Sequence, residues 1–543
     1  MSLRYKKHDF ENREIEKEDT SWKTGWIDLN FLRIFILATC LKLLLIPTYH
    51  STDFEVHRNW LAITYSLPIK EWYVEATYQW TLDYPPLFAW FEYALSNLAV
   101  YFDREMLRID NFNYASPATI VFQRCSVIVA DLMFAYGTRE IGRVLCKTKN
   151  SYLLFTFLSL FNVGLLVVDH VHFQYNGFLL GILLLSMAKV SEVIYQGEVL
   201  VGATWFAILL NLKHIYLYTA PAYTVWLLKW CCTKRNQFLG KFIKLGFIVV
   251  IVFFFSFGPF IDQLPQVLSR LFPFKRGLVH AYWAPNFWAL YAGADKILSA
   301  ICRRAGWLSN MKIAIMTGGL VQEDSFALLP TPTPLVTFAI TFLTMLHPLW
   351  VLFTKDRVKN EPSHFVRCAI LCSLSSFLFG WHVHEKAILT AIIPLCCLAV
   401  TEKTEAKVFM ILSSAGHTAL LPLLYPENLT PLKLLLSMTY MTVAFLTLSH
   451  QFGKPLLNKK QQLYITVLPL ITVYETIIHK LIFRENLPFL PLALTSIYCA
   501  AGIMYTWIYY YYIFLYKIAS VSETTIKTGR SRTLSDSKSN KIK

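Results

Sequence analysis

The sequence predicts an all-α membrane protein that crosses the bilayer many times, and three observations lead to this prediction. Of the 543 residues, 55% are apolar and only 16% are charged, whereas soluble proteins average about 25% charged residues. The apolar residues gather in long runs, and a bilayer-spanning helix needs about 20 mainly apolar residues in succession. About fourteen such runs are present by this criterion. An ordinary soluble domain and a disordered chain are both excluded.

The predicted spans form two series with a gap between them. The first comprises residues 28–47, 117–136, 151–168, 176–195, 199–213, 215–230 and 243–262, and the second comprises 335–354, 364–381, 385–401, 407–424, 430–448, 463–481 and 488–514. The fifth and sixth runs are short for a bilayer crossing, so a single kinked span is the alternative for that pair. Together the spans define a membrane domain over residues 28–514.

Basic residues place the two ends of the chain. An even number of spans puts both termini on one side, and the Lys and Arg residues that follow the second, sixth and eighth spans lie on that side. Cytoplasmic loops of membrane proteins are rich in Lys and Arg. Residues 1–27 and a disordered basic tail over 515–543 are therefore predicted to be cytoplasmic. The net charge of +16 has the same explanation, and no nucleic-acid partner is predicted.

Two long segments on the opposite face are predicted to carry the chemistry. They cover about residues 48–116 and 263–334. Connections of this length are uncommon unless they have a function of their own. We therefore look for functional residues on the non-cytoplasmic face.

An acidic pair opens the first long segment. Asp53 and Glu55 stand beside His57 and Arg58, directly after an apolar span. Asp is a favoured helix cap, so a solvated helix start is one interpretation. The other is a general base at the membrane surface that neighbouring cations keep ionised.

A further acidic residue stands before two prolines. Asp83 and Tyr84 precede Pro85 and Pro86, which fix the start of the next helix. Asp83 either caps this helix or contributes to binding. The aromatic residues of 78–90 suit stacking on a sugar ring, although anchoring at the membrane interface is their commoner role.

The turn between the third and fourth spans is unusually polar. It contains Asp169, His170, His172, Gln174 and Asn176. A plain turn needs fewer polar side chains, which favours a functional role. The two histidines face the same side if the chain is extended. Metal binding is one interpretation, but the spacing is no known ligand signature, so hydrogen bonding to a sugar or phosphate is preferred.

The second long segment carries a cationic patch. Arg270, Lys275 and Arg276 lie on the face where the positive-inside trend disfavours cations. A phosphate ligand explains such a patch. Anchoring to lipid headgroups is the alternative.

The junction between the ninth and tenth spans holds four titratable residues, His382, His384, Glu385 and Lys386. Ionisable residues squeezed between apolar helices cost free energy and are functional by default. We therefore expect a functional role for this segment.

Three charged residues fall inside the first two spans. Lys42 lies in the first, and Arg124 and Asp131 lie in the second. The latter two share a helix face, and a structural ion pair between them is predicted.

The clusters taken together resemble the endoplasmic-reticulum glucosyltransferases that use dolichyl-phosphate glucose. The matching strings are TDFEVHRNW at 52–60, LDYPP at 82–86, DHVHFQYN at 169–176 and HVHEK at 382–386. The resemblance implies a GT-C glycosyltransferase fold, with a multi-helix membrane body and two long lumenal loops. It also implies residence in the endoplasmic-reticulum membrane with a lumenal active site.

Two paralogous enzymes share this pattern and add the first and the second glucose to the lipid-linked oligosaccharide. Residues 59–63 and 270–291 look like the second-glucose enzyme. The resemblance thus implies inverting transfer of glucose to the monoglucosylated oligosaccharide, with formation of an alpha-1,3 bond. The first-glucose enzyme is one alternative, and a lipid or sugar transporter or scramblase is another. Transporters place ionisable residues near the bilayer midplane, whereas these clusters gather at one face.

The implied reaction assigns roles to the residues. A single displacement needs a base on the acceptor oxygen and no enzyme nucleophile; Asp53 matches the family's acidic residue and is assigned as the base, with Glu55 in reserve. The leaving phosphate is expected to meet Lys386, His384 and Arg276. The expected substrate-binding residues are Glu55, Arg58, Asp83, Asp169, His170, His172, Gln174, Asn176, Lys275, Arg276, His382, His384, Glu385 and Lys386. No metal or cofactor is expected, and the partners are dolichyl-phosphate glucose, the dolichyl-diphosphate-linked oligosaccharide and membrane lipids.

Overall fold

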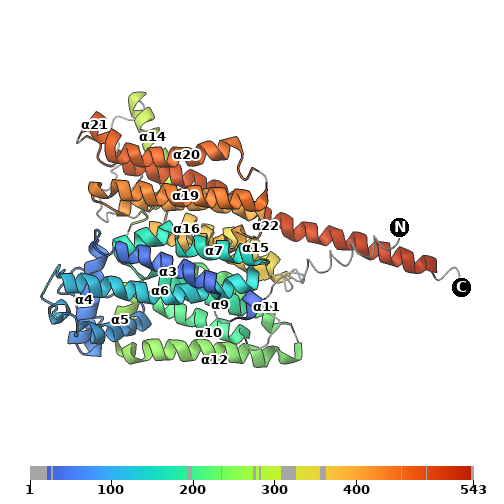
Figure 1. The fold of residues 1–543 in the computed structure, drawn as a ribbon, viewed down its shortest axis with the longest axis horizontal. Helices are drawn as coiled ribbons and strands as arrows, with labels where there is room; N and C mark the ends of the chain where they lie inside the picture. Colours follow the sequence, from blue (N-terminus) through green and yellow to red (C-terminus); the bar gives the residue numbers. More distant parts are fainter. Residues whose placement is uncertain are drawn as a thin grey trace.

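The computed structural model describes residues 21–25, 28–192, 198–233, 235–272, 277–279, 283–306, 326–354, 362–453, 455–484 and 486–539. Regular structure in these residues is entirely helical, with no strand among them. Most helices lie side by side along the long axis of the molecule (Figure 1). The predicted all-α fold class is confirmed.

Each predicted span coincides with a helix or a run of helices. Nine such runs in the described part are long and apolar enough to cross a membrane. They are built from α6 (Pro117–Leu145), α7 (Lys149–Leu160) with α8 (Val163–Leu165) and η3 (Leu166–Phe173), α12 (Phe238–Phe257), α15 (Pro334–Thr354), α16 (Pro362–Phe379), α18 (Lys403–Thr418), α19 (Thr430–Phe452), α20 (Lys459–Val473) with α21 (His479–Phe483), and α22 (Leu490–Ser539). The other predicted spans correspond to the shorter helices α3 (Leu29–Leu44), α9 (Asn176–Ser191), α10 (Glu198–Leu212), α11 (Ala220–Cys231) and α17 (Leu389–Ala399). The chain is a multi-pass membrane protein.

Helices α10 and α11 are two separate helices that run in opposite directions, and not one kinked helix. The start of α10 contacts the last turn of α9, where Lys189 pairs with Glu198 at 3.1 Å. The second half of α11 contacts the same turn, because Trp226 donates to the carbonyl of Val190 at 3.2 Å. Helix α10 therefore leaves that end of the bundle and α11 returns to it.

The predicted long segments contain helices of their own. They are α4 (Thr52–Ser66) and α5 (Pro86–Ala99) in the first segment, and α13 (Leu264–Leu271) and α14 (Phe287–Arg304) in the second. Tyr84 joins α4 to α5, since its ring lies 4.9 Å from those of both Trp60 and Phe88. Both helices lie at the end of the bundle opposite to the one from which α22 projects (Figure 1).

Helix α12 marks the outer surface of the bundle, at its lower edge in Figure 1. Large apolar side chains on it, such as Phe247, Phe254 and Phe255, are exposed. Helix α16, in contrast, is buried along nearly its whole length. An exposed helix with apolar residues on all sides is stable in lipid and not in water.

Helix α22 continues beyond the last predicted span. It runs to Ser539, although the sequence predicts a disordered tail from residue 515. Once a helix has formed, each added residue gains a hydrogen bond without repeating the cost of nucleation, so the membrane helix extends outward (Figure 1).

Candidate active site

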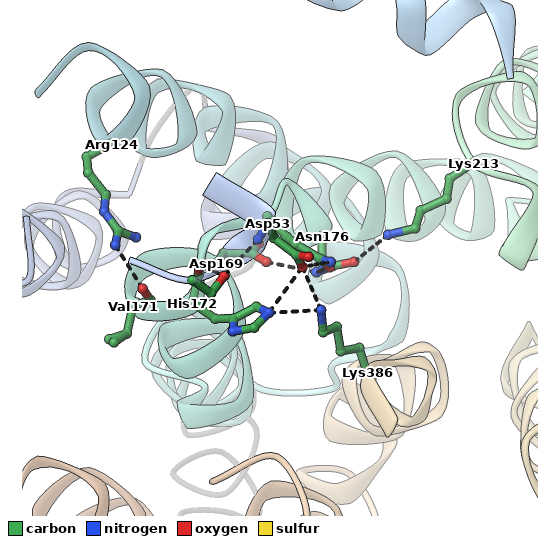
Figure 2. A network of polar contacts seen from close by, with 10 residues as sticks. Asp53, Arg124, Asp169, Val171, His172, Asn176, Lys213 and Lys386 are labelled. Atoms are coloured by element: carbon green, nitrogen blue, oxygen red, sulfur yellow. Dashed lines mark hydrogen bonds and ion pairs between the residues drawn. The ribbon is translucent and has the colours of Figure 1, made fainter. Parts of the chain in front are cut away.

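Asp53 lies at the centre of a group of polar side chains at the start of α4 (Figure 2). Its Oδ2 accepts hydrogen bonds from Lys386 Nζ at 2.7 Å and from Gln174 Nε2 at 2.6 Å, and His172 Nε2 lies 3.1 Å away. Lys386 Nζ also lies 3.0 Å from His172 Nε2. The helix cap is Ser51, whose side chain accepts from the Asp53 amide at 3.1 Å. The Asp53 carboxylate is therefore part of the cluster and does not cap its helix.

Only one oxygen of this carboxylate is engaged. Among the described residues, all three side-chain contacts end on Oδ2 and none ends on Oδ1. The Asp53 side chain keeps 23% of its surface exposed, so Oδ1 is accessible to an arriving molecule. A carboxylate that is held by one oxygen and open at the other has the geometry required of a general base.

Two opposing effects act on the Asp53 carboxyl. Burial raises its pKa, whereas the charge of Lys386 and the hydrogen bond and charge of His172 lower it. The lowering effects are larger, and the pKa lies well below its usual range. Asp53 is therefore ionised at neutral pH and ready to accept a proton.

His172 and Gln174 reach the same carboxylate because the chain leaves the ordinary helix between them. Residues Leu166–Phe173 form the π-helical segment η3, a rare conformation that is frequent at functional sites. Phe173, the last residue of this segment, has a φ of +96°, a region that residues with side chains disfavour. Its ring is buried against Phe54, at a centroid distance of 5.2 Å. This packing holds the strained turn in place.

Arg124 of α6 holds the end of η3. Its guanidinium donates to the carbonyl of Val171 at 2.8 Å (Figure 2). It also donates to the carbonyls of His170 at 2.9 Å and Tyr49 at 2.8 Å. Carbonyls in the last turn of a helix lack partners within it, and Arg124 supplies them. The predicted ion pair between Arg124 and Asp131 is wrong, because Asp131 pairs with other residues.

A second charged group lies deeper in the bundle. Asp131 Oδ2 is 2.6 Å from Lys42 Nζ and 2.8 Å from His170 Nε2, and all three side chains are at most 5% exposed. His170 thus points away from Asp53. The expectation that His170 and His172 face the same side is wrong, because they lie on a π-helical turn and not on an extended chain.

Two amides connect the Asp53 cluster to a second lysine. Asn176 Nδ2 donates to Gln174 Oε1 at 2.7 Å and to Asp169 Oδ1 at 2.9 Å. Asn176 Oδ1 accepts from Lys213 Nζ at 3.1 Å (Figure 2). Asp169 therefore positions the amides and does not contact Asp53 itself.

Lys213 is a site residue that the sequence prediction missed. It follows directly after α10, where the two short apolar runs meet. The available signal was an ionisable residue beside apolar helices, the same signal that pointed to Lys386.

The other predicted residues of the segment before α17 do not contact Asp53. His382 Nδ1 donates to the carbonyl of Gly277 at 2.7 Å. The ring of His384 packs edge-on against that of His382, with centroids 5.5 Å apart, and Glu385 is buried. Of the four predicted residues in this segment, Lys386 alone reaches the carboxylate.

Glu55 and Arg58 pair with each other and do not join the cluster. The Arg58 guanidinium donates to both Glu55 oxygens at 2.8 Å. It also donates to the carbonyls of Met106 and Arg108, so the pair ties α4 to the end of the first long segment. Because both of its oxygens are occupied, Glu55 is not positioned as a reserve base.

Asp83 does not cap the following helix. The N-cap of α5 is Pro85, and no side chain caps this helix. Burial and the charge of Asp83 together raise the pKa of Tyr84. Asp83 thus lies near an aromatic residue of the site but is not part of the Asp53 cluster.

The second-loop cations are only partly described. Lys275 and Arg276 lie outside the described residues. Arg270 donates to the carbonyls of Val74 at 3.3 Å and Glu75 at 2.8 Å, which joins the two long segments.

The cluster combines an ionised carboxylate with an open oxygen, two lysines and a chain of amides. In the part of the chain that the structure describes, no three His, Cys, Asp or Glu side chains are grouped to hold a metal ion. A carboxylate beside cations suits removal of a proton from a hydroxyl close to an anionic group.

Known proteins resemble this chain over most of its length. The model of the ALG6, ALG8 glycosyltransferase family matches residues 38–510. A Bos taurus protein named dolichyl pyrophosphate Glc1Man9GlcNAc2 alpha-1,3-glucosyltransferase is 49% identical over 505 residues, which cover 89% of this chain and 95% of that protein. A Drosophila melanogaster protein, named as a probable enzyme of the same kind, is 48% identical over 489 residues, which cover 89% of this chain and 94% of that protein. The Arabidopsis thaliana protein of that name is 43% identical over 497 residues, covering 88% and 96%.

Proposed function

Because the chain belongs to the ALG6, ALG8 glycosyltransferase family, we propose that it moves glucose from dolichyl-phosphate glucose to the monoglucosylated, dolichyl-diphosphate-linked oligosaccharide. The observation that carries this proposal is the meeting of Asp53, His172, Gln174 and Lys386 at one carboxylate. These residues come from segments that are far apart in the sequence. Their meeting supports one site of proton transfer.

The proposed reaction is a single displacement with inversion. The acceptor hydroxyl oxygen forms a bond to the anomeric carbon of the glucose, and the bond from that carbon to the phosphate oxygen breaks. The bonding electrons pass to the phosphate, and the acceptor proton passes to Asp53 Oδ1, the oxygen left open by the three contacts on Oδ2. A phosphate leaves without being protonated, so a base and good alignment suffice.

The names of the related proteins support the choice of acceptor. The Bos taurus and Arabidopsis thaliana proteins are named for the Glc1Man9GlcNAc2 oligosaccharide, which already carries one glucose. We propose the same acceptor here, so that this chain adds the second glucose.

We also propose that the Asp53 end of the bundle faces the lumen of the endoplasmic reticulum. Arg139 and Arg143 lie in the last turns of α6, far from the Asp53 cluster. The positive-inside trend puts such residues in the cytoplasm. The end of α22 projects from that same side of the bundle (Figure 1).

The test supplies purified protein with dolichyl-phosphate glucose and synthetic acceptors that carry no, one or two glucose residues. We expect transfer to the monoglucosylated acceptor alone, with an alpha-1,3 product bond identified by NMR. Transfer to the non-glucosylated acceptor alone would assign the chain to the first-glucose step. Absence of transfer to all three acceptors would refute the glucosyltransferase proposal.

A further inference from the structure

Lys213 differs from Lys386 in the partners that surround its charge. Lys386 donates directly to the Asp53 carboxylate at 2.7 Å. Lys213 contacts the neutral amide oxygen of Asn176 at 3.1 Å and lies 4.8 Å from the ring centroid of Tyr84. Within the described residues, no carboxylate lies within ion-pair distance of Lys213. The charges of Asp169, Asp53 and Asp83 act on Lys213 from a greater distance, but none of the three forms an ion pair with it. Its ammonium is therefore available to form a charge-assisted hydrogen bond to an incoming anion.

The displacement geometry separates the base from the leaving group. Before reaction, the acceptor oxygen lies about 3–3.5 Å from the anomeric carbon, and the leaving oxygen lies on the opposite side of that carbon. A cation that serves the phosphate must therefore lie away from the base. Lys386 touches Asp53 and lies on the base side. Lys213 is separated from Asp53 by the two amides of Gln174 and Asn176.

The amide chain also fixes this separation. Gln174 donates to Asp53 at 2.6 Å, Asn176 donates to Gln174 at 2.7 Å, and Lys213 donates to Asn176 at 3.1 Å. Figure 2 shows Lys213 approaching Asn176 from a different direction than Lys386 approaches Asp53. The site thus presents a base at one end of the chain and a cation at the other.

We propose that Lys213 binds the phosphate of the glucose donor and stabilises the negative charge that develops on it as the sugar leaves. This role rests on the function proposed above, and it replaces Lys386 as the expected ligand of the leaving phosphate. Lys386 is then a positioning residue that keeps Asp53 ionised.

The kinetic test compares wild type with Lys213→Gln, Lys213→Arg and the control Lys189→Gln. Lys189 lies in α9 and pairs with the partly exposed Glu192 and Glu198, so its loss tests the general effect of removing a lysine. We expect Lys213→Gln to lower kcat/KM for the donor about 100-fold, as loss of one transition-state contact does. We expect the KM of the acceptor to stay within about twofold, because the proposed contact of Lys213 is with the donor phosphate and not with the acceptor.

The variant Lys213→Arg tests whether the loss in Lys213→Gln comes from the missing charge or from a folding defect. Because it keeps the positive charge, we expect it to recover donor kcat/KM to within about tenfold of wild type. Equal losses in the Gln and Arg variants would overturn the proposal, as would a Gln variant no weaker than Lys189→Gln.

A binding test keeps this inference separate from the proposed function, because it needs neither acceptor nor turnover. A short-chain polyprenyl phosphate and the matching polyprenol are titrated onto wild type and Lys213→Gln. We expect wild type to prefer the phosphate by at least about tenfold and Lys213→Gln to lose that preference. An unchanged preference would overturn the phosphate role even if glucose transfer is confirmed. Loss of the preference would support it even if no acceptor is glucosylated.

Discussion

Two triads of lysine, aspartate and histidine lie on either side of one π-helical turn, and they behave differently. They are Lys386–Asp53–His172 and Lys42–Asp131–His170. The lysine-to-carboxylate distances are 2.7 and 2.6 Å, and the histidine-to-carboxylate distances are 3.1 and 2.8 Å. The aspartate side chains are 23% and 5% exposed. The residue types and distances nearly match, so the two triads differ mainly in how far the aspartate is exposed.

The free oxygen of each aspartate explains this difference in access. Asp53 Oδ1 contacts no described side chain and is open to the outside. Asp131 Oδ1 faces the backbone of Gly177, where an added Cβ atom would lie 2.3 Å from it. No substrate fits into that contact. The same three residue types therefore form an accessible cluster, the proposed reactive site, in one place and a buried ion pair in the other.

The largest expected effect is on turnover, in the variant Asp53→Asn. An amide does not accept the acceptor proton, so we expect kcat to fall by about 10²–10⁴-fold, the usual contribution of a general base. Binding of dolichyl phosphate should change little, because in the proposed reaction Asp53 meets the acceptor hydroxyl and not the phosphate. Initial rates and a binding titration measure both quantities. Residual activity within tenfold of wild type would remove Asp53 from the role of base.

Asp131→Asn is expected to act on stability. Removing one partner of a buried ion pair leaves the other charge unpaired and costs about 3–5 kcal/mol. Thermal unfolding in detergent should therefore show a much lower midpoint than for Asp53→Asn. The double variant Lys42→Met/Asp131→Leu removes both charges and should recover most of the loss. If Asp131→Asn unfolds like wild type but loses turnover, then the contrast between the two triads fails.

The smallest expected effect is a shift in the pH dependence of activity in the variant Lys386→Met. Burial raises the pKa of Asp53, and Lys386 is the main group that opposes it. Without the charge of the lysine, the pKa of Asp53 should rise. The base works only when ionised, so activity is lost as the pH falls through this pKa. The acid limb of kcat/KM should therefore move to higher pH, while Lys189→Gln keeps the wild-type profile. An unmoved limb would show that Lys386 does not set the ionisation of Asp53.

The spans were predictable because the bilayer imposes a simple local requirement. A run of apolar residues long enough to cross it must be helical, and each predicted run coincides with a helix. The meeting of Asp53 with Lys386 was also predictable, because ionisable residues beside apolar helices usually have a function and both residues stand in such positions.

Contacts that depend on an unusual backbone conformation, or on partners far apart in the sequence, were not predictable from local patterns. Sequence spacing did not reveal the π-helical turn, so the opposite orientations of His170 and His172 were missed. Arg124 binds carbonyls of a segment 46 and 47 residues away, and no periodic pattern reports such a contact. The pair of Glu55 and Arg58 was available from the sequence, because residues three apart on a helix are neighbours.

The strained turn at Phe173 has a consequence for how the protein can evolve. Glycine would fit the backbone there without steric cost, yet glycine has no ring to contact Phe54 or the Arg124 guanidinium, which lies 5.7 Å from the Phe173 ring centroid. Loss of a buried phenylalanine costs about 3–5 kcal/mol, more than the roughly 1–3 kcal/mol of a disfavoured backbone. Selection for heat resistance should therefore retain an aromatic residue at this position. The alignment of His172 and Gln174 on Asp53 is then inherited through packing, without direct selection on the backbone angle itself.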